Sequence, residues 1–337
     1  MKTIVVLVLT LLSIINASGQ TLKENLKTIV EKYASDSLFN GSILIAKNND
    51  IFYQGSFGYK KIDRIEYNTN STLYAIGSVT KQFTSVAILM LKERKMLSID
   101  DIISKYFEVP KSMEKITIKN LLNHTSGILD YWLNDVSHEK KTILQFIFEK
   151  DTLEFETGTK RLYCNSGYFL LGQIVEIVSG MSYGDFLKKN IFEPLNMKNT
   201  FLFDSKNYDR AIGYDENWKI NDYLITSADG GLISTVEDLY LWDKALMENK
   251  LLSAKSKELM VEPLKLNNNE IVNYGFGWDI NENNRSIVSH TGWLSAFGAY
   301  NQLDKETGYF IILLSNQIRP ELMDLINEIN KELYETE

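Results

Sequence analysis

The first candidate for covalent chemistry is the pair Ser78 and Lys81. From Val79 onward apolar residues recur with helical spacing, and neither Pro nor Gly interrupts them, which predicts a helix that begins near Ser78. Residues three apart share a helical face, so the Lys81 amine is expected within reach of the Ser78 hydroxyl. A serine becomes a good nucleophile when a neighbouring base takes its proton, and a helix N-terminus offers N–H groups to a developing oxyanion. The pair can therefore supply both nucleophile and base.

Other serines match short catalytic patterns. A serine at a helix start is commonly only an N-cap, and Ser-x-x-Lys also occurs at Ser112 and Ser137, where polar surroundings favour the surface. Gly180-Met-Ser-Tyr-Gly184 matches the Gly-x-Ser-x-Gly nucleophile elbow, which requires a preceding strand. A helical pattern precedes it here, so its first glycine is predicted to end that helix. Ser182 is then predicted to cap the next helix together with Asp185, rather than to act as a nucleophile.

Two later segments carry groups that would complete a site of this kind. In Arg161-Leu-Tyr-Cys-Asn-Ser-Gly167 the phenol of Tyr163 and the amide of Asn165 stand two residues apart, so an extended turn points both to one side. Ser289-His-Thr-Gly-Trp293 is predicted to end a strand, and Gly292 would let a substrate backbone lie alongside. An acid for the leaving group and a binding site for the acyl oxygen are the functions that a Ser-Lys pair leaves open.

Taken in this order, the three motifs resemble those of the serine hydrolases that include class C β-lactamases, penicillin-binding D-alanyl-D-alanine peptidases, and related esterases and D-amino-acid peptidases. That family carries Ser-x-x-Lys, then Tyr-x-Asn, then Lys- or His-Thr-Gly. The matching segments here are Ser78-Val-Thr-Lys81, Tyr163-Cys-Asn165 and His290-Thr-Gly292. Other segments also look like family segments: Leu121-Leu-Asn-His-Thr-Ser-Gly127, Gly167-Tyr-Phe-Leu-Leu-Gly172, Phe192-Glu-Pro-Leu-Asn-Met197, Gly230-Gly-Leu-Ile-Ser-Thr235 and Tyr274-Gly-Phe-Gly-Trp278.

The resemblance implies a role for each matched residue. Ser78 would be acylated, Lys81 would accept its proton or activate it electrostatically, and Tyr163 would exchange protons with the leaving group. Which of Lys81 and Tyr163 is the general base stays open. The implied substrate-binding groups are Asn165, His290, Thr291 and Gly292, with an oxyanion hole formed by the backbone N–H groups of Ser78 and Trp293.

Two departures from the family pattern bear on the substrate. Class C β-lactamases have Lys where this chain has His290, which is mostly neutral near pH 7 because its unperturbed pKa is about 6.5. A carboxylate would be held less firmly, which favours a peptidase or esterase over a β-lactamase. Cys164 replaces a small Ala or Ser within the second motif, and we expect a small buried thiol rather than a second nucleophile.

The function implied is an exported serine hydrolase that works through an acyl-enzyme, of the D-alanyl-D-alanine carboxypeptidase or D-amino-acid peptidase kind. The alternatives are an esterase or weak class C-like β-lactamase on the same site, and a non-catalytic sensor that binds penicillin or peptidoglycan. The expected partner is a small-molecule or peptide substrate: a peptidoglycan-like peptide, a β-lactam or an ester.

Composition excludes several other classes of function. The net charge of the 337 residues is −8, so no excess of basic residues indicates binding to nucleic acid. The three histidines, His124, His138 and His290, lack the spacing of a zinc site, so neither a metal nor a cofactor is expected. With a single cysteine, the chain cannot form an internal disulfide bond.

The first residues read as a secretory signal. One early Lys precedes an apolar core, and Ala17-Ser18-Gly19 is typical of a cleavage site, which predicts a signal peptide over residues 1–19. The apolar core is too short to span a bilayer comfortably, so no stable membrane span is expected after cleavage. The predicted location is periplasmic or extracellular, with an uncleaved anchor as the alternative.

The remaining elements predict how the motifs are positioned. Periodicity indicates helices over 22–33, 169–178, 236–247 (capped by Thr235) and 322–333, a hairpin over 41–57, and strands at 274–280, 286–290, 296–301 and 309–315. We expect one domain over 20–337 of the α/β (α+β type) class. An antiparallel sheet, flanked by N- and C-terminal helices, would occupy about 20–75 and 225–337, with a mainly helical lobe inserted over about 76–224. The fold of the resembled family has the same plan.

Overall fold

The computed structural model describes residues 21–335, so the predicted signal peptide lies outside the described residues. Within this range, strands from both ends of the chain form a six-stranded antiparallel sheet in the order β10-β11-β12-β13-β1-β2. These strands are β1 (Gly41–Lys47), β2 (Asp50–Phe57), β10 (Asp279–Ile280), β11 (Ile287–Leu294), β12 (Phe297–Asp304) and β13 (Tyr309–Ser315). Pairing of β1 with β13 joins the two ends of the chain.

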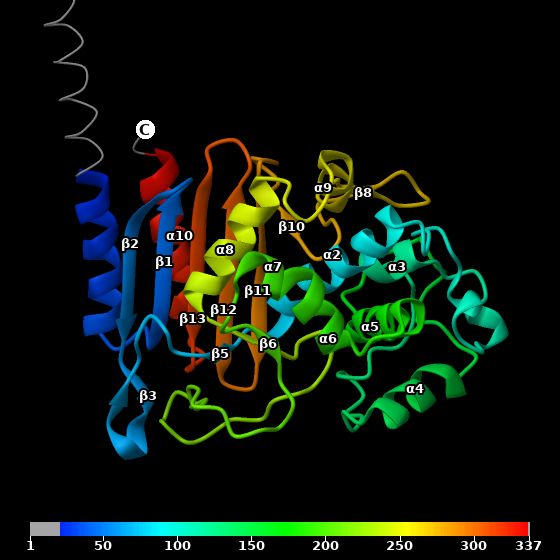
Figure 1. Ribbon diagram of the computed structural model, residues 1–337, viewed down its shortest axis with the longest axis horizontal. Helices are drawn as coiled ribbons and strands as arrows, with labels where there is room; N and C mark the ends of the chain where they lie inside the picture. Colours follow the sequence, from blue (N-terminus) through cyan, green and yellow to red (C-terminus); the bar gives the residue numbers. More distant parts are fainter. Residues whose placement is uncertain (1–20, 336–337) are drawn as a thin grey trace, which may run out of the picture.

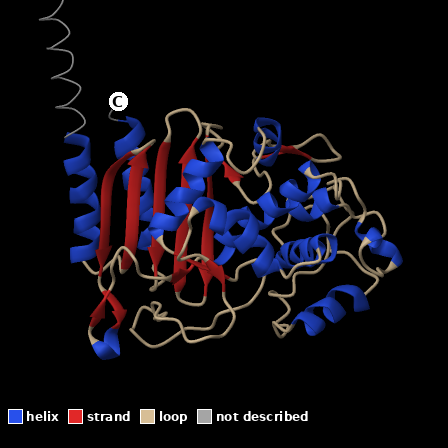
Figure 2. Ribbon diagram, in the orientation of Figure 1, coloured by secondary structure: helices blue, strands red, loops and turns tan. Residues whose placement is uncertain are grey.

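Most of the helices lie to one side of this sheet, as Figures 1 and 2 show. A helix also covers residues 21–35 at the start of the described range. The others are α2 (Thr80–Glu93), α3 (Ile118–Leu122), α4 (Lys140–Glu149), α5 (Asn165–Ser179), α6 (Tyr183–Leu187), α7 (Glu193–Leu195), α8 (Val236–Met247), α9 (Ala254–Met260) and α10 (Glu321–Glu335), with a π-helical turn at Lys188–Phe192.

Alternation along the strands divides the core between the two faces of the sheet. Ile43 and Ile45 of β1 pack on one face with apolar residues of the helix at 21–35 and of α10. Leu44 points to the opposite face, whose core includes residues of α2, α5 and α8. The two terminal helices therefore cover one face, and the helices from the middle of the chain extend from the other. The predicted fold class is confirmed.

Smaller antiparallel pairs surround the main sheet. β5 (Tyr74–Ala75), β7 (Leu232–Ser234) and β6 (Phe201–Leu202) form a three-stranded sheet, and β8 (Leu264–Lys265) pairs with β9 (Ile271–Val272). β5 leads directly to the segment that contains Ser78.

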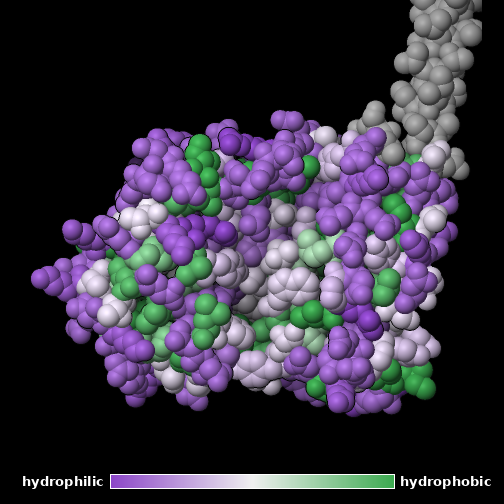
Figure 3. Space-filling model, turned by 180° about the vertical axis from the view of Figure 1, so that it is seen from behind, coloured by the Kyte–Doolittle hydropathy of each residue, from purple (hydrophilic) through white to green (hydrophobic). Residues whose placement is uncertain are grey.

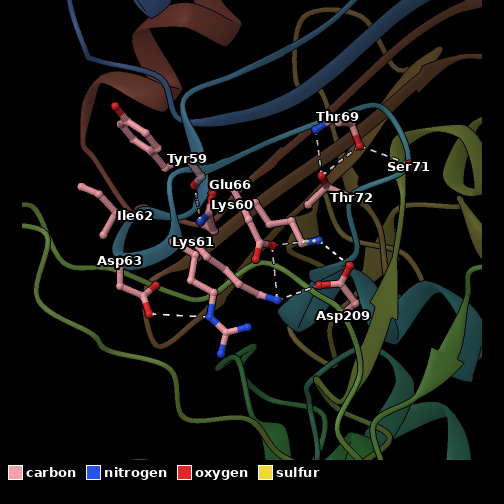
Figure 4. Close-up of polar contacts among 12 residues, drawn as sticks. Tyr59, Lys60, Lys61, Ile62, Asp63, Glu66, Thr69, Ser71, Thr72 and Asp209 are labelled. Carbon is pink, nitrogen blue, oxygen red and sulfur yellow. Dashed lines mark hydrogen bonds and ion pairs between the residues drawn. The ribbon is translucent and has the colours of Figure 1, made fainter.

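The hairpin of β3 (Tyr59–Lys61) and β4 (Glu66–Tyr67) is held by an ion-pair cluster, shown in Figure 4. The Nζ atoms of Lys60 and Lys61 lie 2.7 and 2.6 Å from the carboxylate of Asp209 and 3.6 and 3.5 Å from that of Glu66. The cluster fastens the hairpin to the loop that precedes β7. Because Asp209 is exposed, we expect the ion pairs to add little to the free energy of unfolding and mainly to position the hairpin.

The predicted cap positions are confirmed. Gly180 ends α5 with a φ of +70°, a left-handed conformation that glycine adopts readily. The side chain of Ser182 accepts a hydrogen bond from the backbone N–H of Asp185 at the start of α6. Thr235 caps α8 in the same way, through the backbone N–H of Asp238. Since a helix rather than a strand precedes Ser182, the nucleophile-elbow interpretation is excluded.

Three strand predictions are wrong in their bounds, and the simplest case is the strand predicted over 296–301, which is β12 and continues to Asp304. Of the strand predicted over 274–280 only β10 forms, because Gly277 has a φ of +77° and a Cβ at this position would lie 2.8 Å from the carbonyl oxygen of Lys81. The segment bends so that its backbone can lie against α2. The strand predicted to end at His290 continues to Leu294, where it pairs with Phe297 of β12.

The face of the molecule in Figure 3 is largely hydrophilic, with apolar patches around a central hollow. No helix within residues 21–335 has both the length and the apolar character needed to cross a membrane.

Candidate active site

Ser78 is the middle residue of a 3₁₀ turn, Gly77–Val79, that runs directly into α2. The Nζ of Lys81, in the first turn of the helix, lies 3.0 Å from the Ser78 Oγ. The contact predicted from the spacing of these two residues is therefore present. The hydroxyl and the amine are close enough for direct proton transfer.

Three acceptors surround the Lys81 ammonium. Besides the Ser78 Oγ, its Nζ donates to the Asn165 Oδ1 at 2.9 Å and to the Asp229 carbonyl oxygen at 2.6 Å. The side chain is fully buried, and burial lowers its pKa to about 8, an effect that the nearby carboxylates of Asp229 and Asp130 partly offset. A substantial neutral fraction is therefore present slightly above neutral pH.

The neutral amine fits the same contacts as the charged one. A neutral amine has two N–H donors and one lone pair, whereas the ammonium has three donors. Asn165 and the Asp229 carbonyl can keep the two donors, so the lone pair would face Ser78 and accept the proton of its hydroxyl. Lys81 can thus lose a proton without leaving any of its partners unsatisfied.

Asp130 and Asp229 support this arrangement, and the sequence did not single out either of them. The Asp130 Oδ2 accepts from the Asn165 backbone N–H at 3.1 Å and from its Nδ2 at 3.0 Å, which turns the amide oxygen toward Lys81. The Asp229 carboxylate accepts from the Tyr131 hydroxyl at 2.9 Å, from the Trp132 Nε1 at 3.1 Å and from the Ser227 hydroxyl. Asp229 directly precedes the segment Gly230–Thr235, which resembles a family segment, and this position was the signal that could have identified it.

Tyr163 lies beside the Ser-Lys pair. Its ring centroid is 4.9 Å from the Lys81 Nζ, and its buried hydroxyl has no hydrogen-bond partner among residues 21–335. Burial raises the pKa of Tyr163 well above its usual value, and the nearby Ser78 hydroxyl, which does not meet hydrogen-bonding geometry, offsets part of that rise. The phenol is therefore protonated at neutral pH, with an O–H group that no other group engages.

His290 is held in one neutral tautomer by a chain of hydrogen bonds through Tyr274 and His124. The Cys164 backbone N–H donates to the His124 Nδ1 at 3.1 Å, so the ring proton of His124 is on Nε2, which lies 3.1 Å from the Tyr274 hydroxyl. That hydroxyl then donates to the His290 Nε2 at 3.2 Å, and the His290 Nδ1–H donates to the Thr291 carbonyl oxygen at 2.6 Å. The Cys164 N–H at one end of this hydrogen-bond series and the Thr291 carbonyl oxygen at the other therefore require the same position for every proton between them.

Burial lowers the pKa of His290 to about 3, with the Lys81 charge as a smaller cause, and it holds the pKa of His124 well below its usual range. The unperturbed pKa of about 6.5 therefore does not apply to His290, because that value refers to an exposed ring, and the ring is neutral near pH 7 by a wider margin than that value implies. A neutral imidazole with both nitrogens bonded does not supply a positive charge to a substrate carboxylate.

This arrangement predicts that His290 stays neutral from pH 5.5 to 8.5, since its lowered pKa lies below that window. In ¹⁵N-labelled protein the Nδ1 should keep the chemical shift of a protonated nitrogen and the Nε2 that of an unprotonated one across the range. A titration midpoint near pH 6.5 would contradict the arrangement. The Tyr274→Phe protein, which lacks the donor to the His290 Nε2, provides a matched comparison.

Strand β11 closes the other side of the site by packing its backbone on the 3₁₀ turn. A Cβ on Gly77, whose φ is +49°, would lie 2.8 Å from the Trp293 backbone nitrogen. A Cβ on Gly292 would lie 2.0 Å from the Ile76 carbonyl oxygen. The close approach expected at Gly292 is therefore made by the chain itself rather than by a substrate backbone, and it brings the backbone of Trp293 next to that of Ser78.

A cavity of about 500 Å³ opens above these groups. Of the residues predicted from the sequence, those that line it are Ser78, Tyr163, Asn165, His290, Thr291 and Trp293, while Lys81 is buried beneath them. Apolar side chains, Trp132, Ile225 and Leu294, also contribute to the lining, as does the cation of Arg161. The cavity has room for a substrate whose scissile carbonyl lies against Ser78.

The competing candidates lie elsewhere. Ser182 is 2.6 Å from an Asp185 carboxylate oxygen and lines a separate cavity. Cys164 is a free, buried thiol, as predicted, and burial raises its pKa. Within residues 21–335 no group of three or more His, Cys, Asp or Glu side chains could hold a metal ion.

Comparison with known proteins agrees with this geometry. Penicillin-binding protein 4* of Bacillus subtilis (strain 168) is 32% identical over 303 residues, which is 81% of this chain and 67% of that protein. The crystal structure of a penicillin binding protein from Bacillus halodurans is 27% identical and superposes with a TM-score of 0.79 over 90% of this chain and 98% of the other. D-amino acid amidase from Ochrobactrum anthropi SV3, at 21% identity, shares the fold with a TM-score of 0.80 over 94% of this chain and 99% of its own.

The family model described as Beta-lactamase matches residues 26–334, which include all of the groups described above. The predicted resemblance is confirmed by this match and by the relatives. The chain belongs to the β-lactamase family, and it is a serine hydrolase of the kind that includes penicillin-binding proteins.

Proposed function

We propose that this chain is an exported serine hydrolase that forms an acyl-enzyme on Ser78 and acts on peptides that end in D-alanyl-D-alanine or another D-amino acid. The observation that carries the proposal is the Lys81 amine, which lies 3.0 Å from the Ser78 Oγ and has its pKa lowered to about 8 by burial. The signal-like residues 1–19 support export to the periplasm or the outside of the cell.

The proposed acylation step begins with neutral Lys81. Its lone pair takes the proton of Ser78 as the Oγ attacks the scissile carbonyl carbon. The carbonyl oxygen becomes an oxyanion that the backbone N–H groups of Ser78 and Trp293 would stabilise. Collapse of the tetrahedral intermediate breaks the bond to the leaving group, and the Tyr163 O–H supplies the proton that the leaving nitrogen or oxygen needs. The proton that Lys81 accepted must then pass to the Tyr163 oxygen, which restores the neutral amine and the protonated phenol beside it. Water then attacks the acyl-enzyme while Lys81 takes its proton, and the Ser78 Oγ leaves as a hydroxyl to release the acid.

The environments of the two candidate bases support different roles for them. Burial moves the pKa of Lys81 down toward neutrality and that of Tyr163 further up. Since a general base must be deprotonated and a general acid protonated near the working pH, we assign the base to Lys81 and the acid to Tyr163. Asn165 orients Lys81, and its link to Asp130 fixes the amide.

A second candidate function, ester hydrolysis or weak β-lactamase activity, uses the same groups. It is favoured by the apolar lining of the cavity, which suits the acyl part of an ester. A non-catalytic sensor would need to bind a β-lactam or a peptidoglycan fragment without releasing it. The Ser78, Lys81 and Tyr163 arrangement supports turnover over simple binding, because a binder needs no poised acid.

The proposal is tested by intact-mass measurement after exposure in turn to a penicillin, an N-acyl-D-alanyl-D-alanine peptide and an activated ester. We expect a transient adduct of the acyl group with the peptide, accompanied by release of D-alanine. A stable penicillin adduct without D-alanine release would favour the sensor. Rapid turnover of the ester alone would favour the esterase, and the absence of any adduct would contradict the proposal.

A further inference from the structure

Arg161 contributes a cation to the lining of the cavity, whereas Lys81 is buried beneath it. The Arg161 side chain is 27% exposed, and its guanidinium carbon lies 4.2 Å from the centroid of the Tyr274 ring. The nearest carboxylate is that of Asp279, whose Oδ1 is 4.0 Å from the Arg161 Nη2, beyond the usual length of a charge-assisted hydrogen bond. The Nε is buried and has no hydrogen-bond partner among the described residues.

The other basic groups at the site are not free to bind a substrate anion. The three donors of Lys81 are directed to Ser78, Asn165 and Asp229, and His290 is neutral. Of the described residues that line the cavity, Arg161 is therefore the cation with donors left for a ligand. The cation–π contact with the Tyr274 ring restrains the guanidinium, which lowers the entropy lost when an anion binds.

We propose that Arg161 binds a carboxylate on the leaving-group side of the substrate and thereby makes the enzyme prefer acids over the corresponding amides. This inference rests on the proposed function. Arg161 lies two residues before Tyr163, the proposed acid, and both side chains line the cavity. A group held by Arg161 is therefore next to the departing end of the substrate rather than the acyl end, which would lie toward the apolar lining.

Asp279 sets the strength of this preference. Its carboxylate also lines the cavity and faces the same guanidinium, so it competes with a bound carboxylate and repels it. Removal of that charge would leave Arg161 with no acidic neighbour within ion-pair distance among the described residues. The pair thus predicts opposite effects of two substitutions on one property, the acid-to-amide ratio of kcat/KM.

The experiment compares an N-acyl-D-alanyl-D-alanine peptide with its C-terminal amide, measured as kcat/KM in wild type, Arg161→Gln, Arg161→Lys and Asp279→Asn. We expect the acid-to-amide ratio to fall about 10- to 100-fold in Arg161→Gln, the range for loss of a hydrogen-bonded charge pair. Arg161→Lys should recover part of the ratio, because it keeps the charge but not the bidentate fork. Asp279→Asn should raise the ratio.

The rate of labelling by a neutral fluorophosphonate reports on Ser78 itself in each variant. Equal losses for acid, amide and fluorophosphonate in Arg161→Gln would overturn the inference, because they would show a structural effect. A wild-type protein that is labelled at Ser78 yet hydrolyses both peptides equally would also overturn it. A wild-type protein that is not labelled, or that hydrolyses neither peptide, would instead overturn the proposed function.

Discussion

Replacement of Lys81 by Met is expected to slow acylation of Ser78 by about 10³- to 10⁴-fold, the upper range for loss of a general base. Met is similar in length and apolar, so it can occupy the buried position while removing the amine. The wild-type rate should rise about tenfold per pH unit below the Lys81 pKa of about 8 and level off above it, since the neutral amine is the active form. Stopped-flow acylation by an activated ester from pH 6 to 10 measures both effects.

Lys92→Met provides a matched control, because this lysine lies in the last turn of the same helix and outside the cavity. It should leave both the rate and the pH profile unchanged. An inflection near pH 8 that persists in Lys81→Met would show that another group is the base.

Tyr163→Phe is expected to lower kcat by about 10²-fold or more while leaving the melting temperature unchanged. The substitution keeps the ring and removes a hydroxyl that has no hydrogen-bond partner among residues 21–335, so no partner is left unsatisfied. The loss should be larger for a peptide than for an activated ester, because a poor leaving group depends more on protonation. Steady-state kinetics on both substrates, with thermal unfolding, tests this.

Tyr168→Phe should give the reverse pattern. The Tyr168 hydroxyl donates to the Leu122 carbonyl oxygen at 2.6 Å, so its removal should reduce the free energy of unfolding by about 1 kcal/mol or more and have a small effect on kcat. If Tyr163→Phe instead retained full peptidase activity, Lys81 would have to serve as both base and acid.

The sequence predicted the local features of this site because they depend on near neighbours. Helical spacing alone was enough to place Lys81 next to Ser78, and turn chemistry identified the caps at Gly180 and Ser182. That Tyr163 and His290 would join them did not follow from spacing, since the three motifs are far apart in the chain. Their convergence was implied by the family resemblance.

Other features depend on burial and long-range packing, which the sequence pattern does not encode. The charge state of His290 is set by its burial in the folded chain and by its hydrogen bond with Tyr274. The reference pKa of an exposed histidine does not include either effect. Asp130 and Asp229 support Lys81 from separate loops. Tyr274 lies in a segment that resembles a family segment and that the residue pattern predicted to be a strand. The bend at Gly277 against α2, which prevents that strand, depends on packing and did not follow from the pattern.

The central claim is that Ser78 is the acylated residue, and peptide mapping after fluorophosphonate labelling tests it most directly. Wild type and Ser182→Ala should carry the label on the peptide that contains Ser78, and Ser78→Ala should carry none. A label that survives Ser78→Ala and disappears in Ser182→Ala would contradict the account.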